Sequence, residues 1–148
     1  MYHAIDPDPP AATRRLSVTP DAFATQMALL AGSGMTPVTA AALGRAWRGD
    51  GALPARPVLV TFDDGYAGVH TYALPVLLSY GFGATLFVTT GWLRTGRGEA
   101  AGAPAPMLDW PRLAELAAAG IEIGGHTHSH PHLDRLPGPR LRAEVRRD

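Results

Sequence analysis

Residues 58–66, Val-Leu-Val-Thr-Phe-Asp-Asp-Gly-Tyr, constrain the fold of this chain more than any other stretch. Apolar residues that favour extended backbone run directly into two adjacent carboxylates, Asp63 and Asp64, which precede a glycine. This order predicts a buried strand that ends abruptly and places acidic groups at its carboxyl end. In parallel α/β folds that end is where ligands bind. Because two neighbouring buried carboxylates repel each other, the pattern also predicts a cation or a basic partner nearby.

A histidine-rich stretch could complete such a site, since residues 125–132 contain His126, His128, His130 and His132. The four-residue spacing would place His126 with His130, and His128 with His132, on one face of a helical turn. An extended strand would instead place all four on one face, so spacing does not choose between these arrangements. The neighbouring glycines and Pro131 favour an irregular loop. Adjacent carboxylates with clustered imidazoles and no cysteine favour a divalent metal such as zinc, the alternative being a solvated loop.

Apolar periodicity along the rest of the chain alternates between the strand and the helix pattern. Residues 94–106 are predicted to be a flexible surface loop, and Pro75 is expected either to kink its helix or to mark the true start. The alternation predicts an α/β fold with a parallel sheet or barrel, and with both polar clusters at the carboxyl ends of strands on one face. The predicted helices are 20–32, 39–47, 69–80, 109–119 and 140–148, and the predicted strands are 35–38, 58–62, 84–89 and 121–123.

Composition excludes several classes of protein. The 148 residues carry a formal net charge of +0, so nothing indicates nucleic acid or an anionic membrane as a partner. There is no cysteine, which excludes disulfides and thiolate ligands. No apolar run reaches membrane-spanning length, so we expect no transmembrane segment. No secretory signal is recognisable at residue 1, and an export signal would have to lie upstream, which leaves the compartment open.

The two polar clusters resemble the paired motifs of one family. Residues 61–66 are similar to the first motif of the polysaccharide deacetylases, also called the NodB-homology domain or family 4 of the carbohydrate esterases. Residues 126–131 resemble their second motif, His-Ser/Thr-x-x-His-Pro. The resemblance extends to the exopolysaccharide, or poly-N-acetylglucosamine, branch through residues 1–3, 19–23, 107–110 and 119–124. It implies a partial (β/α) barrel of parallel strands, as a single incomplete domain over residues 1–148 with the NodB-homology motif region at 57–148.

The resemblance also implies a function and residue roles. It implies a metal-dependent hydrolase that removes N-acetyl groups from an amino-sugar polysaccharide, with Asp63 as general base. Asp64, His126 and His130 are the implied ligands of a divalent metal, most often zinc, with cobalt or nickel as alternatives. Coordination chemistry agrees, because three protein ligands leave a position open for water and an unliganded carboxylate can take its proton.

Other polar residues near the motifs receive supporting roles. Thr127 and His128 are expected to orient the loop from outside the ligand shell. His132 is expected either to be solvated or to act from outside the ligand shell as well. Tyr66 is expected either to pack against the site or to touch the sugar. His3 is expected to line the same pocket as a substrate-binding residue.

Three later motifs of the family are not found in this sequence: an Arg-Pro-rich motif, an Asp/Trp motif and a late Leu-x-Leu-His motif. The chain is therefore predicted to be the N-terminal portion of a deacetylase, without the C-terminal strands of the family barrel. With base and metal alone it is expected to bind metal, to turn over poorly and to self-associate through an uncovered sheet edge. Two alternatives stay open: a truncated, non-catalytic remnant that binds carbohydrate or metal, and an O-acetyl esterase of the same family.

Overall fold

The computed structural model describes residues 1–95, 100 and 102–148. Every sheet in this part of the chain is parallel, which confirms the predicted α/β class. The sheets pair β1 (Ala4–Ile5) with β2 (Ser17–Val18), β3 (Thr36–Val38) with β4 (Pro57–Leu59), and β5 (Thr61–Asp64) with β6 (Thr85–Val88), which in turn pairs with β7 (Glu122–Gly125). β4 and β5 are two halves of one extended stretch, interrupted at Val60. A bridge from Tyr2 to Phe62 joins the N-terminal strand to β5, so the strands form part of a barrel wall.

Three of the helices begin at side chains that satisfy free backbone N–H groups. Thr19 and Thr39 accept from residues three positions along the chain, at 3.3 Å in both cases, and Asp109 accepts from Arg112 N at 2.9 Å. These acceptors lie one residue before α1 (Pro20–Gly32), α2 (Ala40–Trp47) and α4 (Trp110–Ala118), which begin at or within one residue of the predicted starts. The α-helices are α1 (Pro20–Gly32), α2 (Ala40–Trp47), α3 (Leu74–Ser79), α4 (Trp110–Ala118) and α5 (Gly138–Arg147). Among the described residues, no helix combines the length and hydrophobicity needed to cross a bilayer.

The segment predicted as one helix over 69–80 has two parts. Residues Val69–Ala73 form a π-helical turn, η2, and α3 begins at Leu74 with Pro75 in its first turn. Because proline has no N–H to donate and its φ suits a first turn, Pro75 marks the true start of the α-helix, as one of the two alternatives predicts. Short 3₁₀ turns complete the fold as η1 (Arg14–Leu16), η3 (Thr90–Trp92) and η4 (Leu133–Arg135).

Other boundaries differ from the predictions by one or two residues. The strand predicted over 58–62 continues to Asp64, so both carboxylates belong to the strand itself. α5 begins at Gly138 and ends at Arg147, instead of running from 140 to 148. The predicted flexible loop over 94–106 lies partly outside the described residues.

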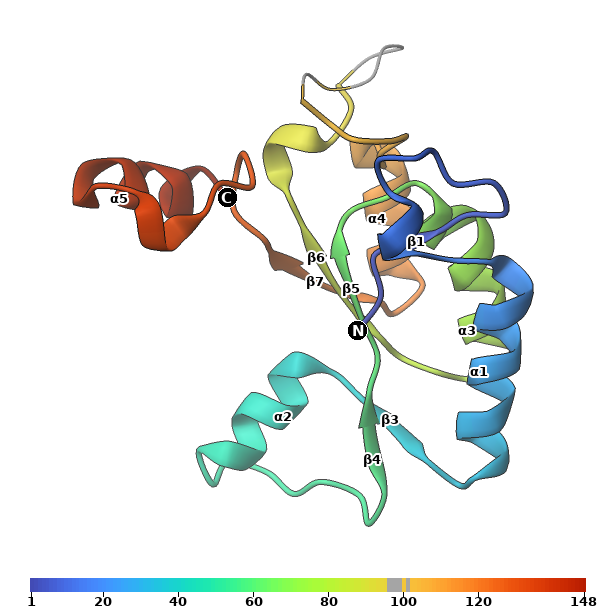
Figure 1. Cartoon of the computed structure of the whole chain (residues 1–148). Helices are drawn as coiled ribbons and strands as arrows, with labels where there is room; N and C mark the ends of the chain where they lie inside the picture. The colour runs from blue at the N-terminus through green and yellow to red at the C-terminus, as the bar shows by residue number, and fades with distance from the viewer. Residues whose placement is uncertain (96–99, 101) are drawn as a thin grey trace.

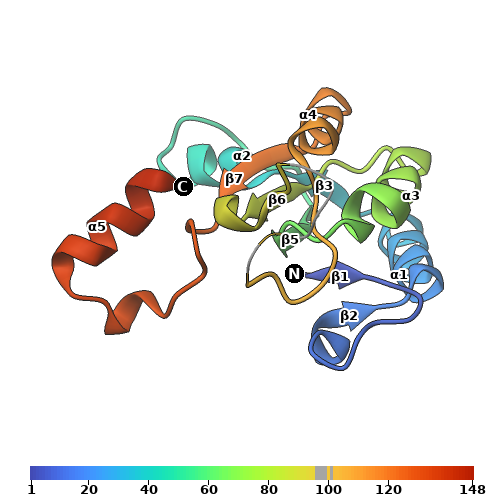
Figure 2. The ribbon, with the colours of Figure 1, turned by 90° about the horizontal axis from the view of Figure 1, so that it is seen from above.

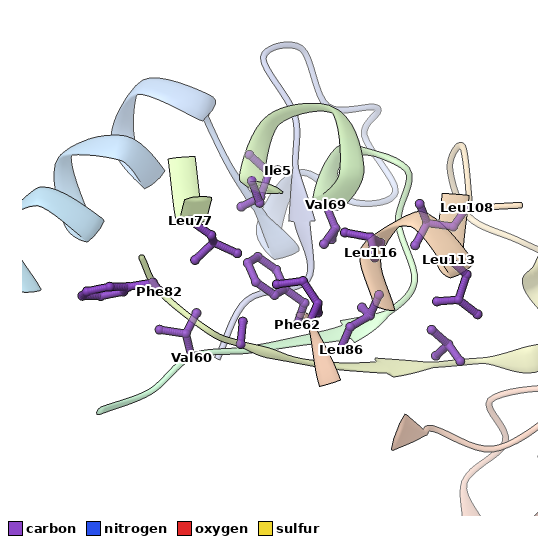
Figure 3. Packing of buried hydrophobic residues seen from close by; sticks show 14 of the residues in the cluster. Ile5, Val60, Phe62, Val69, Leu77, Phe82, Leu86, Leu108, Leu113 and Leu116 are labelled. Carbon is purple, nitrogen blue, oxygen red and sulfur yellow. The ribbon is translucent and has the colours of Figure 1, made fainter. Parts of the chain in front are cut away.

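One hydrophobic core holds the sheet against α1, α3 and α4, which cover one of its faces (Figures 1 and 2). Phe62 of β5 and Leu86 of β6 contribute from the sheet, and Leu77 and Leu116 from the helices, all at 0% exposure (Figure 3). Burying each such side chain stabilises the fold by about 1.5–3 kcal/mol. The packing fixes β5, β6 and β7 relative to one another, which positions whatever follows their carboxyl ends.

The amino ends of β6 and β7 are occupied by the start of α2. Ala40 N donates to Thr85 Oγ1 at 2.9 Å, and Ala41 N donates to Glu122 Oε1 at 3.0 Å. The Glu122 carboxylate thereby meets the positive end of the α2 dipole. The start of α2 therefore covers the amino ends of β6 and β7, and the carboxyl ends lie at the opposite end of these strands.

Candidate metal centre

Parallel register brings the two sequence motifs together. Asp64 is paired with Val88, and Val88 with Gly125, so the last residues of β5, β6 and β7 form one row. His126 follows β7 directly, and its N–H donates to Val88 O at 2.8 Å. Asp64 and His126 lie 62 positions apart in the sequence, yet they share one end of the sheet as the alternation of strands and helices predicts.

Asp64, His126 and His130 converge on one point. Asp64 Oδ1 lies 3.4 Å from His126 Nε2 and 3.2 Å from His130 Nε2. One ligand atom from each of the three residues lies within 4.8 Å of the others. The Asp64 side chain is 4% exposed, whereas the imidazoles of His126 and His130 are 35% and 42% exposed. The carboxylate is therefore at the base of the group, and the imidazoles are its solvent-accessible side.

The three residues fit a divalent metal ion. Asp64 Oδ1 is buried and has no hydrogen-bond partner among the described residues, although two imidazole nitrogens lie close to it. A buried acceptor without a partner costs free energy, and it calls for an explanation such as an ion. One carboxylate oxygen and two imidazole nitrogens form a donor set suited to zinc with a further position left free.

Tyr66 supports the buried carboxylate. Its side chain is 2% exposed and donates a hydrogen bond to Asp64. Burial, and then the negative charge and hydrogen bond of Asp64, raise the pKa of the Tyr66 phenol far above its usual value of 10.0. The hydroxyl therefore remains a proton donor to Asp64 at neutral and mildly alkaline pH. Tyr66 packs against the site, while its contact with substrate stays a prediction.

Replacing Tyr66 by phenylalanine is expected to lower the free energy of unfolding by about 1.5–3 kcal/mol, because the charged Asp64 loses a buried donor. The sign of the pH dependence follows from the raised pKa. The unfolded phenol ionises near pH 10 while the folded one does not, so the stabilisation by Tyr66 is full below pH 10 and declines above it. Urea unfolding of both proteins between pH 7 and pH 11 measures this difference. A difference in unfolding free energy between the two proteins that grows with pH would contradict the raised pKa of Tyr66.

Asp63 directly precedes the candidate ligand Asp64 in β5. Its side chain is half-buried, and its backbone is held by N–H donation to Tyr2 O at 2.9 Å. The next residue, Asp64, has a φ of 76°, a conformation uncommon outside glycine that costs free energy. The chain therefore turns sharply between two adjacent acids, of which only Asp64 belongs to the metal-ligating group found among the described residues.

The histidine loop is irregular, as predicted. Thr127 and His130 have positive φ values of 69° and 56°, so neither the helical nor the extended arrangement applies. Thr127 Oγ1 accepts from His130 N at 3.1 Å, which closes the turn between the two candidate ligands. The supporting role of Thr127 stays a prediction.

His128 faces a segment to which sequence reasoning assigned no role in the site. Its Nδ1 is hydrogen-bonded to Thr90 Oγ1 at 3.0 Å, and its carbonyl accepts from Gly91 N at 2.7 Å. A Cβ at Gly91 would lie 2.4 Å from the His128 carbonyl oxygen, so only glycine fits there. Thr90 and Gly91 follow β6 and occupy the same end of the sheet, which is the one sequence signal that could have indicated them.

Of the residues that the structure describes, His132 and His3 do not belong to the candidate metal-ligating group. His132 is exposed. His3 lines a hollow with Arg15 and Gln26, next to the N-terminal strand, and the three candidate ligands are not among its described lining residues. A substrate-binding role for His3 stays a prediction.

Comparison with known proteins assigns the family. Residues 50–148 match the family model described as polysaccharide deacetylase. The chain belongs to the polysaccharide deacetylase family, as the paired motifs indicate. It is 30% identical over 137 residues to the poly-β-1,6-N-acetyl-D-glucosamine N-deacetylase of Escherichia coli strain K12. That match covers 87% of this chain and 20% of the relative, so the chain spans about a fifth of the relative's length.

Solved structures agree with the fold. The Streptococcus pyogenes deacetylase PplD, in complex with acetate, superposes with a TM-score of 0.82 at 27% identity. IcaB from Ammonifex degensii superposes with a TM-score of 0.79 at 28% identity. These matches cover 97% and 99% of this chain, and 62% and 63% of the two neighbours. The predicted fold class and the resemblance to the poly-N-acetylglucosamine branch are confirmed.

Proposed function

We propose that this chain carries the metal and general-base residues of a carbohydrate N-deacetylase that acts on an N-acetylated amino-sugar polysaccharide. The observation that supports it most is the convergence of Asp64, His126 and His130, with the buried Asp64 Oδ1 left without a hydrogen-bond partner among the described residues. Asp63, the proposed base, directly precedes Asp64 in the sequence. The E. coli relative is named for poly-β-1,6-N-acetyl-D-glucosamine, which makes a β-1,6-linked polymer the first substrate to test. Over residues 1–148 the chain then forms a single deacetylase-like domain.

The proposed reaction is hydrolysis of an acetamide. When bound by Asp64, His126 and His130, a zinc ion would lower the pKa of water and polarise the acetyl carbonyl. Asp63 accepts a proton from the attacking water, whose oxygen forms a bond to the acetyl carbon. The C–N bond then breaks while the proton held by Asp63 is transferred to the nitrogen, which restores the carboxylate; the free amino sugar and acetic acid leave, and the acid ionises to acetate. Tyr66 keeps the Asp64 carboxylate fixed throughout.

Acetate release tests this proposal. The protein is incubated with β-1,6-linked N-acetylglucosamine oligomers after chelator treatment, with and without added Zn²⁺. We expect release only with the metal, and more from these oligomers than from β-1,4-linked chito-oligosaccharides. Release from acetylated xylan alone would identify an O-acetyl esterase instead. Zinc binding without release from any acetyl donor would identify a non-catalytic remnant.

A further inference from the structure

The ring of Trp92 lies against a candidate metal ligand. Its centroid is 5.0 Å from the imidazole centroid of His130, and the two planes are inclined by 24°, which is a stacked arrangement. The His130 imidazole in turn lies 5.1 Å from that of His126. Three rings are therefore in contact in series, and two of them belong to candidate ligands.

His130 needs such a contact because its surroundings restrain it little. The side chain is 42% exposed, and His130 itself lies in an irregular loop, where its backbone has a φ of 56°. Its backbone N–H is held by Thr127, but that bond does not restrict rotation of the imidazole. A stacked aromatic neighbour does restrict it, since a shift of the ring plane loses the contact.

Trp92 is itself held by the same elements that support the site. The backbone N–H of Trp92 donates to Thr89 O at 2.9 Å, and its side chain packs against the buried cluster of Ala4, Tyr66 and Met107. Tyr66 of that cluster donates to Asp64. One small cluster thus supports the carboxylate through Tyr66 and an imidazole through Trp92.

We propose that Trp92 is a positioning residue that fixes the His130 imidazole with Nε2 directed at the metal position. This inference depends on the metal site of the proposed function. Outer residues that orient metal ligands commonly change metal affinity by 10–100-fold. Trp92→Leu is therefore expected to weaken Zn²⁺ binding about tenfold. Trp92→Phe keeps a stacking ring and is expected to stay within about threefold of the parent.

Zinc competition against a chromophoric chelator measures these affinities. Trp47→Phe is the matched control, because Trp47 is 79% exposed at the end of α2. Circular dichroism of the metal-free proteins identifies variants that fail to fold, and the phenylalanine variant keeps the test valid if Trp92→Leu is one of them. Parent-like zinc affinity in folded Trp92→Leu would overturn the inference, as would a phenylalanine variant no tighter than the leucine variant.

Fluorescence gives an independent readout. The chain has three tryptophans, so a Trp47→Phe/Trp110→Phe protein retains only Trp92 as an indole emitter. Titration with Co²⁺ is expected to quench this emission with the same midpoint as metal binding. Unchanged emission while Co²⁺ binds would contradict stacking on a ligand.

Failure of this inference differs from failure of the proposed function. If the parent binds no Zn²⁺, both fail. If the parent binds Zn²⁺ and releases acetate while folded Trp92→Leu binds Zn²⁺ equally well, only the positioning role fails. A loss of acetate release with unchanged zinc affinity would also overturn it, because Trp92 would then act on the substrate.

Discussion

Replacing Asp63 by asparagine is expected to lower the rate of acetate release by about 10²–10⁴-fold, the usual contribution of a positioned general base. Asparagine keeps the size and shape of the side chain but does not accept a proton from water. Asp63 does not belong to the candidate metal-ligating group found in the described part of the chain, so zinc affinity is expected to remain that of the parent. The measurements are acetate release at saturating Zn²⁺ and zinc affinity by chelator competition.

Asp50→Asn is the matched control for this substitution. Asp50 is 68% exposed and lies beside Arg48, in the loop after α2, so the same chemical change occurs far from the site. We expect parent-like activity from this control. A parallel loss of zinc affinity in Asp63→Asn would assign Asp63 to the metal, and unchanged turnover would remove its role as base.

Replacing Asp64 by asparagine is expected to have opposite effects on the metal-free and the zinc-loaded protein. Without metal, the change removes a buried charge whose Oδ1 has no partner, and the amide can donate toward the imidazole nitrogens. We expect the free energy of unfolding to rise by about 1 kcal/mol. With Zn²⁺ at 100 times its dissociation constant, the parent gains about 2.7 kcal/mol, and the variant is expected to lose this gain.

Thermal unfolding with chelator and with Zn²⁺ separates the two effects. His132→Ala serves as the control, since His132 is an exposed member of the same histidine run and is not one of the candidate ligands. It is expected to keep the full stabilisation by zinc. If His132→Ala loses that stabilisation and Asp64→Asn retains it, the ligand set is wrong.

The local elements of this protein could be predicted from sequence because their signals are local. Thr19 before Pro20 and Asp109 before Trp110 mark helix starts through a side-chain acceptor and the residues that follow. The strand before Asp63 is evident from its consecutive apolar residues. Parallel topology followed from the alternation of elements, and with it the expectation that the carboxylates and the histidines share one end of the sheet.

The contacts made by the segment after β6 could not be predicted in this way. Thr90, Gly91 and Trp92 contact His128 and His130 from positions 37 or 38 residues earlier in the sequence, and no spacing rule links them. The same holds for the packing of Tyr66 against the site, because only the tertiary structure shows that this residue is buried and interacts with Asp64. The hollow lined by His3 could not be predicted either, because a sequence position near a strand does not specify which hollow a side chain lines.

The sequence by itself determined the types of chemical group in this protein, the strands that carry them and the family to which they belong, because these depend on residue identity and short-range pattern. Tertiary structure decided which two of four histidines meet Asp64 and which neighbours hold them in place. That choice depends on backbone turns at Asp64, Thr127 and His130 with positive φ. Such turns are stabilised by packing and hydrogen bonds from distant segments, whose effect no local pattern contains.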